Sequence, residues 1–199
     1  MDNLIFIITG IILYVFYIFN KNSLKLIEAH NGIKYYVQDE KDKQSAANLL
    51  AQIEERLYKI RDHCITNIEN HDYRSYKPYI KRLKKKFHRN RTQIYENTTK
   101  LGSTSYSVNK GEELVFCIRH RKKEDKNKLH KINTLMYVAI HELAHIGCPE
   151  IGHTPLFNRI FRFLLNIGIE IGVYKHEKYR ETRPEYCGMT LNTNIVHRN

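Results

Sequence analysis

The feature that most constrains the fold is the segment of residues 135–146, LMYVAIHELAHI, which places histidines and a glutamate inside a mostly apolar run. The residues around them are nearly all apolar, and a solvated patch of histidine and glutamate would not be expected in so apolar a helix. Asn133 or Thr134 can cap its start. Gly147 and Pro149 end it, because Gly suits the left-handed position after a helix and Pro cannot continue the turn. The segment therefore predicts an enclosed helix.

Two histidines of this helix have the spacing of metal ligands. His141 and His145 are four residues apart, so both imidazoles project from one face and can reach one ion. Glu142 lies beside them and points past the ion to the position of a bound water. In this HExxH arrangement two neutral imidazoles bind Zn²⁺, the ion lowers the pKa of its water toward ~7, and the glutamate accepts the proton. The pattern predicts a zinc site in which Glu142 is the catalytic base.

A catalytic zinc site usually has three protein ligands and one open position, and four later residues could supply the third. His153 is favoured, because it stands directly before a Thr-Pro pair that begins the next helix, one tight loop after the first two ligands. Glu170 on that next helix would instead give a site of two histidines and one glutamate. Glu150 lies too near the turn to swing round easily, and Cys148 would give a closed, structural site.

The remaining pattern indicates an α+β domain. Residues 32–39 read as a strand, and residues 46–68 carry one apolar stripe at spacings of three and four, which predicts a long helix facing the core. Residues 104–121 read as a hairpin that turns at Asn109 to Gly111, and its edge could pair with an extended substrate backbone. Residues 157–174 predict an apolar helix behind the site. We therefore expect a small zincin-like domain, with an active-site helix and a short mixed sheet.

Residues 77–91, KPYIKRLKKKFHRNR, contain eight basic residues and no acidic one, in a chain whose net charge is +12. The favoured interpretation is a solvated helix face, with Tyr79, Ile80, Leu83 and Phe87 packed inward. Such a run could also contact nucleic acid through its phosphates, or anionic lipid.

The N-terminal block of residues 4–19 carries no charge, and as a helix it would span roughly 24 Å, a little less than a ~30 Å hydrocarbon core. An uncleaved anchor is favoured over a signal peptide, because no basic segment precedes the block and no small-residue cleavage site follows it. Lys21, Lys25 and Lys34 follow the block, so the rest of the chain is expected in the cytosol.

Three further features concern the C-terminal half and the cysteines. Cys64, Cys117, Cys148 and Cys187 are widely spaced, which favours free thiols in a reducing compartment. A downstream tyrosine, Tyr186, could polarise the scissile carbonyl or stabilise its oxyanion. Met189 could form an apolar floor beneath zinc. Packing is the favoured role of both Tyr186 and Met189.

The segments HELAH and GHTPLF together resemble the WLM and SprT-like zinc metallopeptidases, in which HExxH is followed by a Gly-His-x-x-x-Phe-like segment. In this resemblance His141, His145 and His153 match the ligands, Glu142 matches the base, and the flanking positions are Gly152 and Phe157. SYSVNKGEELVFCIR, NTLMYVAIHELAHI, EIGHTPLF and YCGMTL together are similar to the WLM-like metallopeptidases of large nucleocytoplasmic DNA viruses. The resemblance covers most of residues 32–191.

The spacing departs from the metzincin pattern HExxHxxGxxH, because Ile151 stands where that pattern has its third histidine. Cellular members of the resembled families act on proteins bound or crosslinked to DNA, a task that suits an anchored chain poorly.

These observations predict an anchor at residues 1–20, a linker at 21–31, a zincin-like domain at 32–191 and a tail at 192–199. The predicted activity is that of a zinc metalloendopeptidase acting on protein substrates from a host or virion membrane, with its domain in the cytosol. The alternative is a membrane-bound binding protein with a basic nucleic-acid or lipid surface and a structural or vestigial zinc. An inactive Glu142→Gln variant would favour the first.

Overall fold

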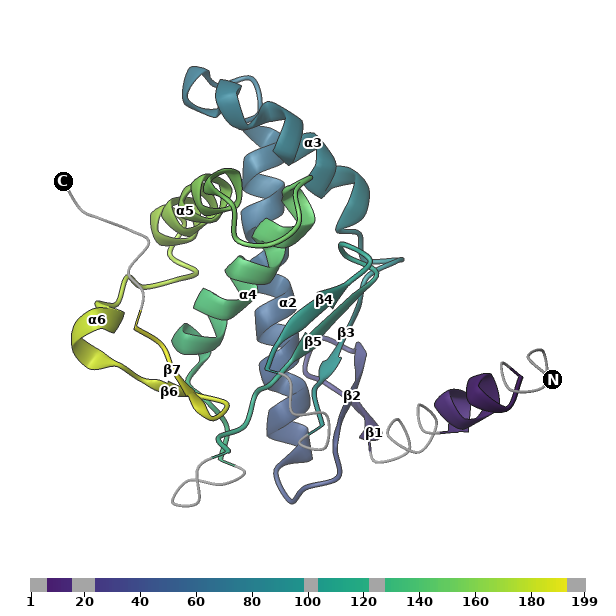
Figure 1. The fold of residues 1–199 in the computed structure, drawn as a ribbon. Helices are drawn as coiled ribbons and strands as arrows, with labels where there is room; N and C mark the ends of the chain where they lie inside the picture. The colour runs from purple at the N-terminus through teal and green to yellow at the C-terminus, as the bar shows by residue number, and fades with distance from the viewer. Residues whose placement is uncertain (1–6, 16–23, 99–103, 122–127, 193–199) are drawn as a thin grey trace.

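The structure, a computed structural model, describes residues 7–15, 24–98, 104–121 and 128–192 of the chain (Figure 1). A short helix covers residues 7–15. The other elements, in chain order, are β1 (Leu24–Glu28), β2 (Lys34–Gln38), α2 (Lys43–Thr66), the 3₁₀ helix η1 (His71–Tyr76), α3 (Lys77–Lys86), β3 (Gln93–Glu96), β4 (Tyr106–Val108), β5 (Glu113–Phe116), α4 (Ile132–Gly147), α5 (Pro155–Glu170), α6 (Tyr179–Thr182), β6 (Glu185–Tyr186) and β7 (Met189–Thr190).

Five strands form one mixed sheet in the order β1-β2-β3-β5-β4. The pairs β1–β2 and β4–β5 are antiparallel, whereas β2–β3 and β3–β5 are parallel. The predicted hairpin is confirmed: its last strand pair is Val108↔Glu113, and its turn contains Asn109 and Lys110 in left-handed backbone conformations, at φ values of 47° and 54°. The α+β prediction with a short mixed sheet is therefore confirmed, and β4 lies at an edge of that sheet.

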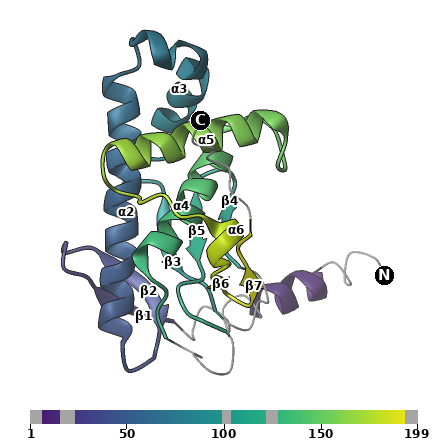
Figure 2. The ribbon, with the colours of Figure 1, turned by 90° about the vertical axis from the view of Figure 1, so that its left-hand side faces the viewer.

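The long helix α2 carries the predicted apolar stripe. Leu50, Ile53, Leu57 and Ile60 are completely buried. These side chains recur once per turn, so the helix presents one continuous apolar face. That face meets β2 on one side and α4 on the other, and α4 in turn packs against α3 and α5 (Figure 2). The helix with the HExxH sequence thus lies at the centre of the helical layer, as its apolar composition predicts.

The basic run forms α3 and the segment after it. Ile80, Leu83 and Phe87 are at most 1% exposed, and the Phe87 ring stacks on Tyr58 with 4.5 Å between ring centroids. The inward packing of these apolar residues is confirmed. Lys81, Lys84 and Lys85 lie on the exposed side of the same helix.

The domain begins earlier than the sequence predicts. Residues 24–28, assigned above to a linker, form β1, which pairs with β2 from Leu24↔Gln38 to Glu28↔Lys34. The linker assignment missed this strand because only Leu24 of its side chains is buried, so the segment lacks a clear apolar face.

Within the described residues, no helix is long and apolar enough to cross a membrane. Residues 7–15 of the predicted anchor form an exposed helix, and the rest of residues 4–19 lies outside the described part of the chain. Residues 193–199 of the predicted tail also lie outside it.

Both ends of α4 differ from the prediction. The N-cap is Lys131, without a side-chain cap, and Asn133 instead donates to the carbonyl of Lys175 at 2.8 Å. Gly147 is the last helical residue rather than a left-handed one. A Cβ added to Gly147 would lie 3.3 Å from the Leu83 side chain, so glycine here permits the close approach of α3.

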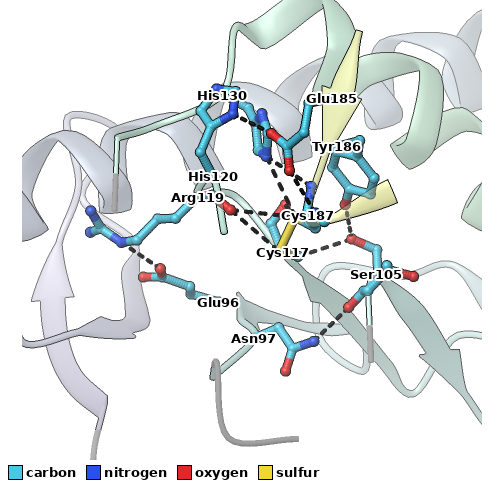
Figure 3. Close-up of a disulfide and its surroundings, with 12 residues drawn as sticks. Glu96, Asn97, Ser105, Cys117, Arg119, His120, His130, Glu185, Tyr186 and Cys187 are labelled. Carbon is cyan, nitrogen blue, oxygen red and sulfur yellow. Dashed lines mark hydrogen bonds and ion pairs between the residues drawn. A yellow bond between two sulfur atoms is a disulfide. The ribbon is translucent and has the colours of Figure 1, made fainter. Parts of the chain in front are cut away.

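The expectation that all four cysteines are free thiols is wrong for Cys117 and Cys187. Cys117 and Cys187 form a disulfide across a sequence separation of 70 residues, whereas Cys64 and Cys148 are free and buried (Figure 3). The pair meets because the β6–β7 hairpin folds back against the segment after β5. Sequence spacing gives no signal of a contact that depends on this tertiary arrangement.

Candidate metal centre

His141, His145 and His153 meet where α4 ends and α5 begins. Their Nε2 atoms lie 3.1 Å apart for His141 and His145, 3.0 Å for His141 and His153, and 3.2 Å for His145 and His153. Helix α4 places the first two one turn apart. His153 precedes Thr154, whose hydroxyl accepts the N–H of Phe157 and caps α5 as predicted. The structure therefore brings all three predicted ligands together.

The three nitrogens fit a single zinc ion. Zinc–nitrogen distances of ~2.0–2.1 Å place the nitrogens of a tetrahedral site about 3.3 Å apart, close to the separations found here. Three neutral imidazole nitrogens that face one another at 3.0–3.2 Å cannot all be paired in hydrogen bonds with each other, because each neutral ring has only one N–H. A cation bound by all three nitrogens would accept their lone pairs and so give each nitrogen a partner.

The local electrostatics keep His141 and His145 neutral, the form that binds metals. Burial, with the neighbouring His145 and His153, lowers the pKa of His141 to about 3. Burial, with His153 and Lys110, lowers the pKa of His145 to about 4. Neither ring has to lose a proton before it binds an ion at pH 7.

The other three candidate ligands lie elsewhere. The Glu170 side chain is 62% exposed at the far end of α5, with its Oε1 3.7 Å from Nε2 of His63. Glu150 accepts a hydrogen bond from the Thr154 hydroxyl. Cys148 is buried as a free thiol. Within the described residues, the group of possible metal ligands at this position consists of the three histidines, whose ligand atoms lie within 4.8 Å of one another.

Glu142 is buried beside the histidines. Its residue is 6% exposed, and burial raises the pKa of its carboxyl group to about 7. The hydroxyl and the backbone N–H of Ser107 hydrogen-bond the carboxylate and partly oppose this rise. Ser107 lies in the edge strand β4, and no sequence pattern singles it out beyond its place in the expected hairpin.

A lysine at the hairpin tip fixes the loop that carries His153. The Lys110 Nζ donates to the carbonyl of Cys148 at 2.8 Å and to that of Glu150 at 2.5 Å. These two bonds join the β4–β5 turn to the connection between α4 and α5. Sequence reasoning missed this residue, because nothing local connects positions 40 residues apart.

Aromatic rings, rather than a methionine, support the imidazoles from below. Phe157 is 1% exposed, and its ring stacks on His145 at 4.2 Å and meets His141 edge-on at 4.9 Å. Met189 is 49% exposed and lines the rim of the cleft. Met189 is therefore not buried by packing, and the ring that lies against His141 and His145 is that of Phe157.

Tyr186 is 2% exposed in the wall of the cleft. Its hydroxyl hydrogen-bonds the hydroxyl of Ser105 (Figure 3). The predicted packing role is consistent with this burial, although the residue also lines the cleft that contains the histidines.

These parts enclose a cleft of about 620 Å³. Its walls come from the segment 104–110 that includes β4, from α4, from the loop 150–153 and from the β6–β7 hairpin. The three histidines and the buried carboxyl group therefore open onto a space bordered by the edge of a sheet.

Comparison with known proteins assigns a family. No protein-family model matches the chain. The chain is 34% identical over 193 residues to the uncharacterized protein R325 of Acanthamoeba polyphaga mimivirus, an alignment that covers 96% of this chain and 94% of that protein. The chain belongs to the family of this mimivirus protein.

Other relatives of this viral family match parts of the chain. An uncharacterized protein of Invertebrate iridescent virus 6 is 36% identical over 101 residues, which is 49% of this chain and 53% of that protein. One of Invertebrate iridescent virus 3 is 39% identical over 74 residues, or 37% of this chain and 44% of that protein.

Two solved structures of Wss1 from Saccharomyces cerevisiae, one of them a mutant, align with 69% of this chain. Their TM-scores are 0.47 and 0.46, at 18% and 16% identity, and the alignments cover 88% and 87% of those chains.

Proposed function

We propose that the chain is a membrane-anchored, zinc-dependent metallopeptidase, of the WLM or SprT-like type, that hydrolyses peptide bonds of protein substrates. The observation that carries the proposal is the convergence of three Nε2 atoms, 3.0–3.2 Å apart, beside the buried carboxyl group of Glu142. A structural metal site needs ligands alone. A hydrolytic site needs ligands and a base together, and both open here onto one cleft.

His141, His145 and His153 would hold the ion through their Nε2 atoms. Three protein ligands leave a coordination position for water or substrate, which distinguishes catalytic from structural zinc sites. When bound, Zn²⁺ supplies Lewis-acid chemistry, because it polarises a carbonyl group and makes water more acidic.

Glu142 would take a proton from the attacking water and deliver it to the leaving amine. A pKa of about 7 suits both transfers near neutral pH, because neither protonation state is then strongly disfavoured. The two hydrogen bonds from Ser107 hold the carboxyl group in one orientation, so β4 positions the base as well as lining the cleft.

The substrate would lie along β4. Among the described strands this one pairs with β5 alone, so its second edge can accept an extended peptide as an additional strand. Main-chain hydrogen bonds of this kind select for an extended backbone rather than for one sequence. The proposed substrate class is therefore an unfolded or extended segment of a protein.

The proposed location is the cytosolic face of a host or virion membrane, with residues 4–19 as a single-pass anchor. This proposal follows from the uncharged block and the lysines after it. The basic residues of 77–91 would then face anionic lipid or nucleic acid.

The first test is Glu142→Gln in the full chain, assayed for zinc content and for digestion of a fluorescent casein substrate. We expect retained zinc and a loss of cleavage on the order of 10²–10⁴-fold. Glu170→Gln, which alters a glutamate remote from the cluster, serves as the matched control and should keep its activity. Equal cleavage by both variants would refute the assignment of the base, and a binding protein would then be the better description.

The second test concerns the third ligand. His153→Ala should lose one equivalent of zinc relative to the parent chain, whereas Glu170→Gln should lose none. Full retention of zinc by the His153 variant would remove this residue from the site.

A further inference from the structure

A second group of metal-binding side chains lies behind the cleft wall, around the Cys117–Cys187 disulfide (Figure 3). His120, His130 and Glu185 each offer a ligand atom, and these atoms lie within 4.8 Å of one another. The three come from the segment after β5, the segment before α4 and the β6 strand. We call this group, together with Cys187, the second cluster.

One pair of atoms in the second cluster has the separation expected of two ligands around one ion. The Nε2 of His130 lies 3.5 Å from the Sγ of Cys187. Two ligands of a tetrahedral zinc site, with Zn–S ≈ 2.3 Å and Zn–N ≈ 2.0–2.1 Å, would lie about 3.6 Å apart. The Nδ1 of His120 meets a carboxylate oxygen of Glu185, and the two imidazole rings are 3.8 Å apart between centroids.

His130 presents an unprotonated ring nitrogen to the second cluster, and metal binding would replace the hydrogen bond that this nitrogen now accepts. His130 is 4% exposed, and its Nε2 accepts the backbone N–H of Cys187 at 3.3 Å, so this nitrogen carries a lone pair rather than a proton. Imidazole, carboxylate and thiolate together form a donor set that suits zinc.

The sulfur can take part only after the disulfide is reduced. Two molecules of a low-molecular-weight thiol supply the two electrons and two protons. The Cys117–Cys187 bond breaks, a disulfide forms between the two reductant molecules, and each protein sulfur becomes a thiol. Metal binding then releases the proton of the Cys187 thiol.

We propose that His120, His130, Glu185 and the Cys187 thiolate form a second zinc site in the reduced protein, and that this site and the Cys117–Cys187 disulfide exclude each other. A cytosolic chain, as predicted, would keep these cysteines reduced. The inference does not depend on the proposed peptidase activity.

Either state secures the same wall of the cleft. Tyr186 stands between Glu185 and Cys187, and its hydroxyl binds Ser105, whose oxygen also accepts the N–H of Cys117 at 2.9 Å. The disulfide or the metal therefore ties the β6–β7 hairpin to the segment after β5. In an oxidising compartment the disulfide would provide this crosslink, and in a reducing compartment the second zinc would provide it instead.

The test is titration of the metal-free full chain with Co²⁺ while absorbance is recorded. We expect the reduced protein to bind two equivalents and to develop a thiolate-to-cobalt charge-transfer band, and the oxidised protein to bind one equivalent without the band. Cys117→Ser leaves Cys187 as a permanent thiol, so it should show the band without any reductant. His153→Ala should lose one equivalent and keep the band.

His130→Ala should lose the band, whereas the matched controls His71→Ala and Cys64→Ala should keep it. His71 is 87% exposed in its side chain, and Cys64 is a buried thiol remote from the second cluster. Circular dichroism verifies that each variant is folded. A reduced parent chain that binds no more equivalents than the oxidised chain, the absence of the band in both the parent and Cys117→Ser, or a disulfide that resists the thiol reductant would each overturn the proposal.

Discussion

Replacing Glu142 with glutamine is expected to stabilise the metal-free fold at neutral and alkaline pH, although it removes the proposed base. Burial raises the pKa of Glu142 from 4.5 to about 7. The folded chain therefore holds a proton that the unfolded chain has already lost. Because of this, the free energy of unfolding contributed by Glu142 is greatest below pH 4.5, falls as the pH rises toward 7, and stays low above that.

The magnitude follows from the two pKa values. A difference of about 2.5 units at 1.36 kcal/mol per unit gives about 3 kcal/mol. Little of this is lost to solvent screening, because Glu142 is only 6% exposed. A glutamine keeps the shape, can accept from Ser107, and carries no charge at any pH. Glu142→Gln should thus match the parent chain at pH 4 and exceed it by roughly 2–3 kcal/mol at pH 8.

The assay is urea unfolding followed by circular dichroism, in the presence of a chelator, at several pH values between 4 and 8. Contributions from His141 and the other titrating groups are common to both chains and cancel in the difference. Glu181→Gln, whose side chain is 66% exposed, should show no such pH-dependent gain. A Glu142→Gln chain that is less stable than the parent at pH 8 would refute the reasoning, since the charged carboxylate would then be favoured by the fold.

Three further outcomes are expected. Phe157→Ala removes the ring stacked on His145 and should cost about 3–5 kcal/mol in urea unfolding, together with weaker zinc retention during dialysis against a chelator. Arg119→Met leaves the buried carboxylate of Glu96 without a guanidinium 2.7 Å away, and should cost about 3–5 kcal/mol. Lys110→Met removes two hydrogen bonds to the loop before His153, and should weaken zinc affinity roughly 10–100-fold in a competition titration with little loss of helix content.

The parts of the site that sequence patterns could predict are local. His141, Glu142 and His145 are arranged by the geometry of one helix, which their spacing reveals directly. Thr154 and the proline after it mark the start of α5, so His153 could be placed at a helix entry without knowledge of the fold. The α2 stripe was recoverable for the same reason, because a helical period shows which face is buried.

The parts that could not be predicted depend on contacts distant in sequence. The Cys117–Cys187 pair is 70 residues apart, and its formation requires the β6–β7 hairpin to fold back on the sheet. Strand β1 is recognisable only by its pairing with β2, because its side chains alternate poorly. Asn133 looked like a helix cap because asparagine commonly is one. Its amide instead bonds Lys175, which no local rule could indicate.

The β4–β5 hairpin links the locally encoded part of the site to contacts that are distant in sequence. Ser107 in β4 holds the carboxyl group of Glu142, and Lys110 at the turn holds the loop that carries His153. Since β4 is also an edge strand of the sheet among the described strands, a displacement of the hairpin would move Glu142, His153 and the proposed substrate edge together. In the proposed function this coupling is an advantage, because pairing of a substrate with β4 would tighten the strand that orients Glu142.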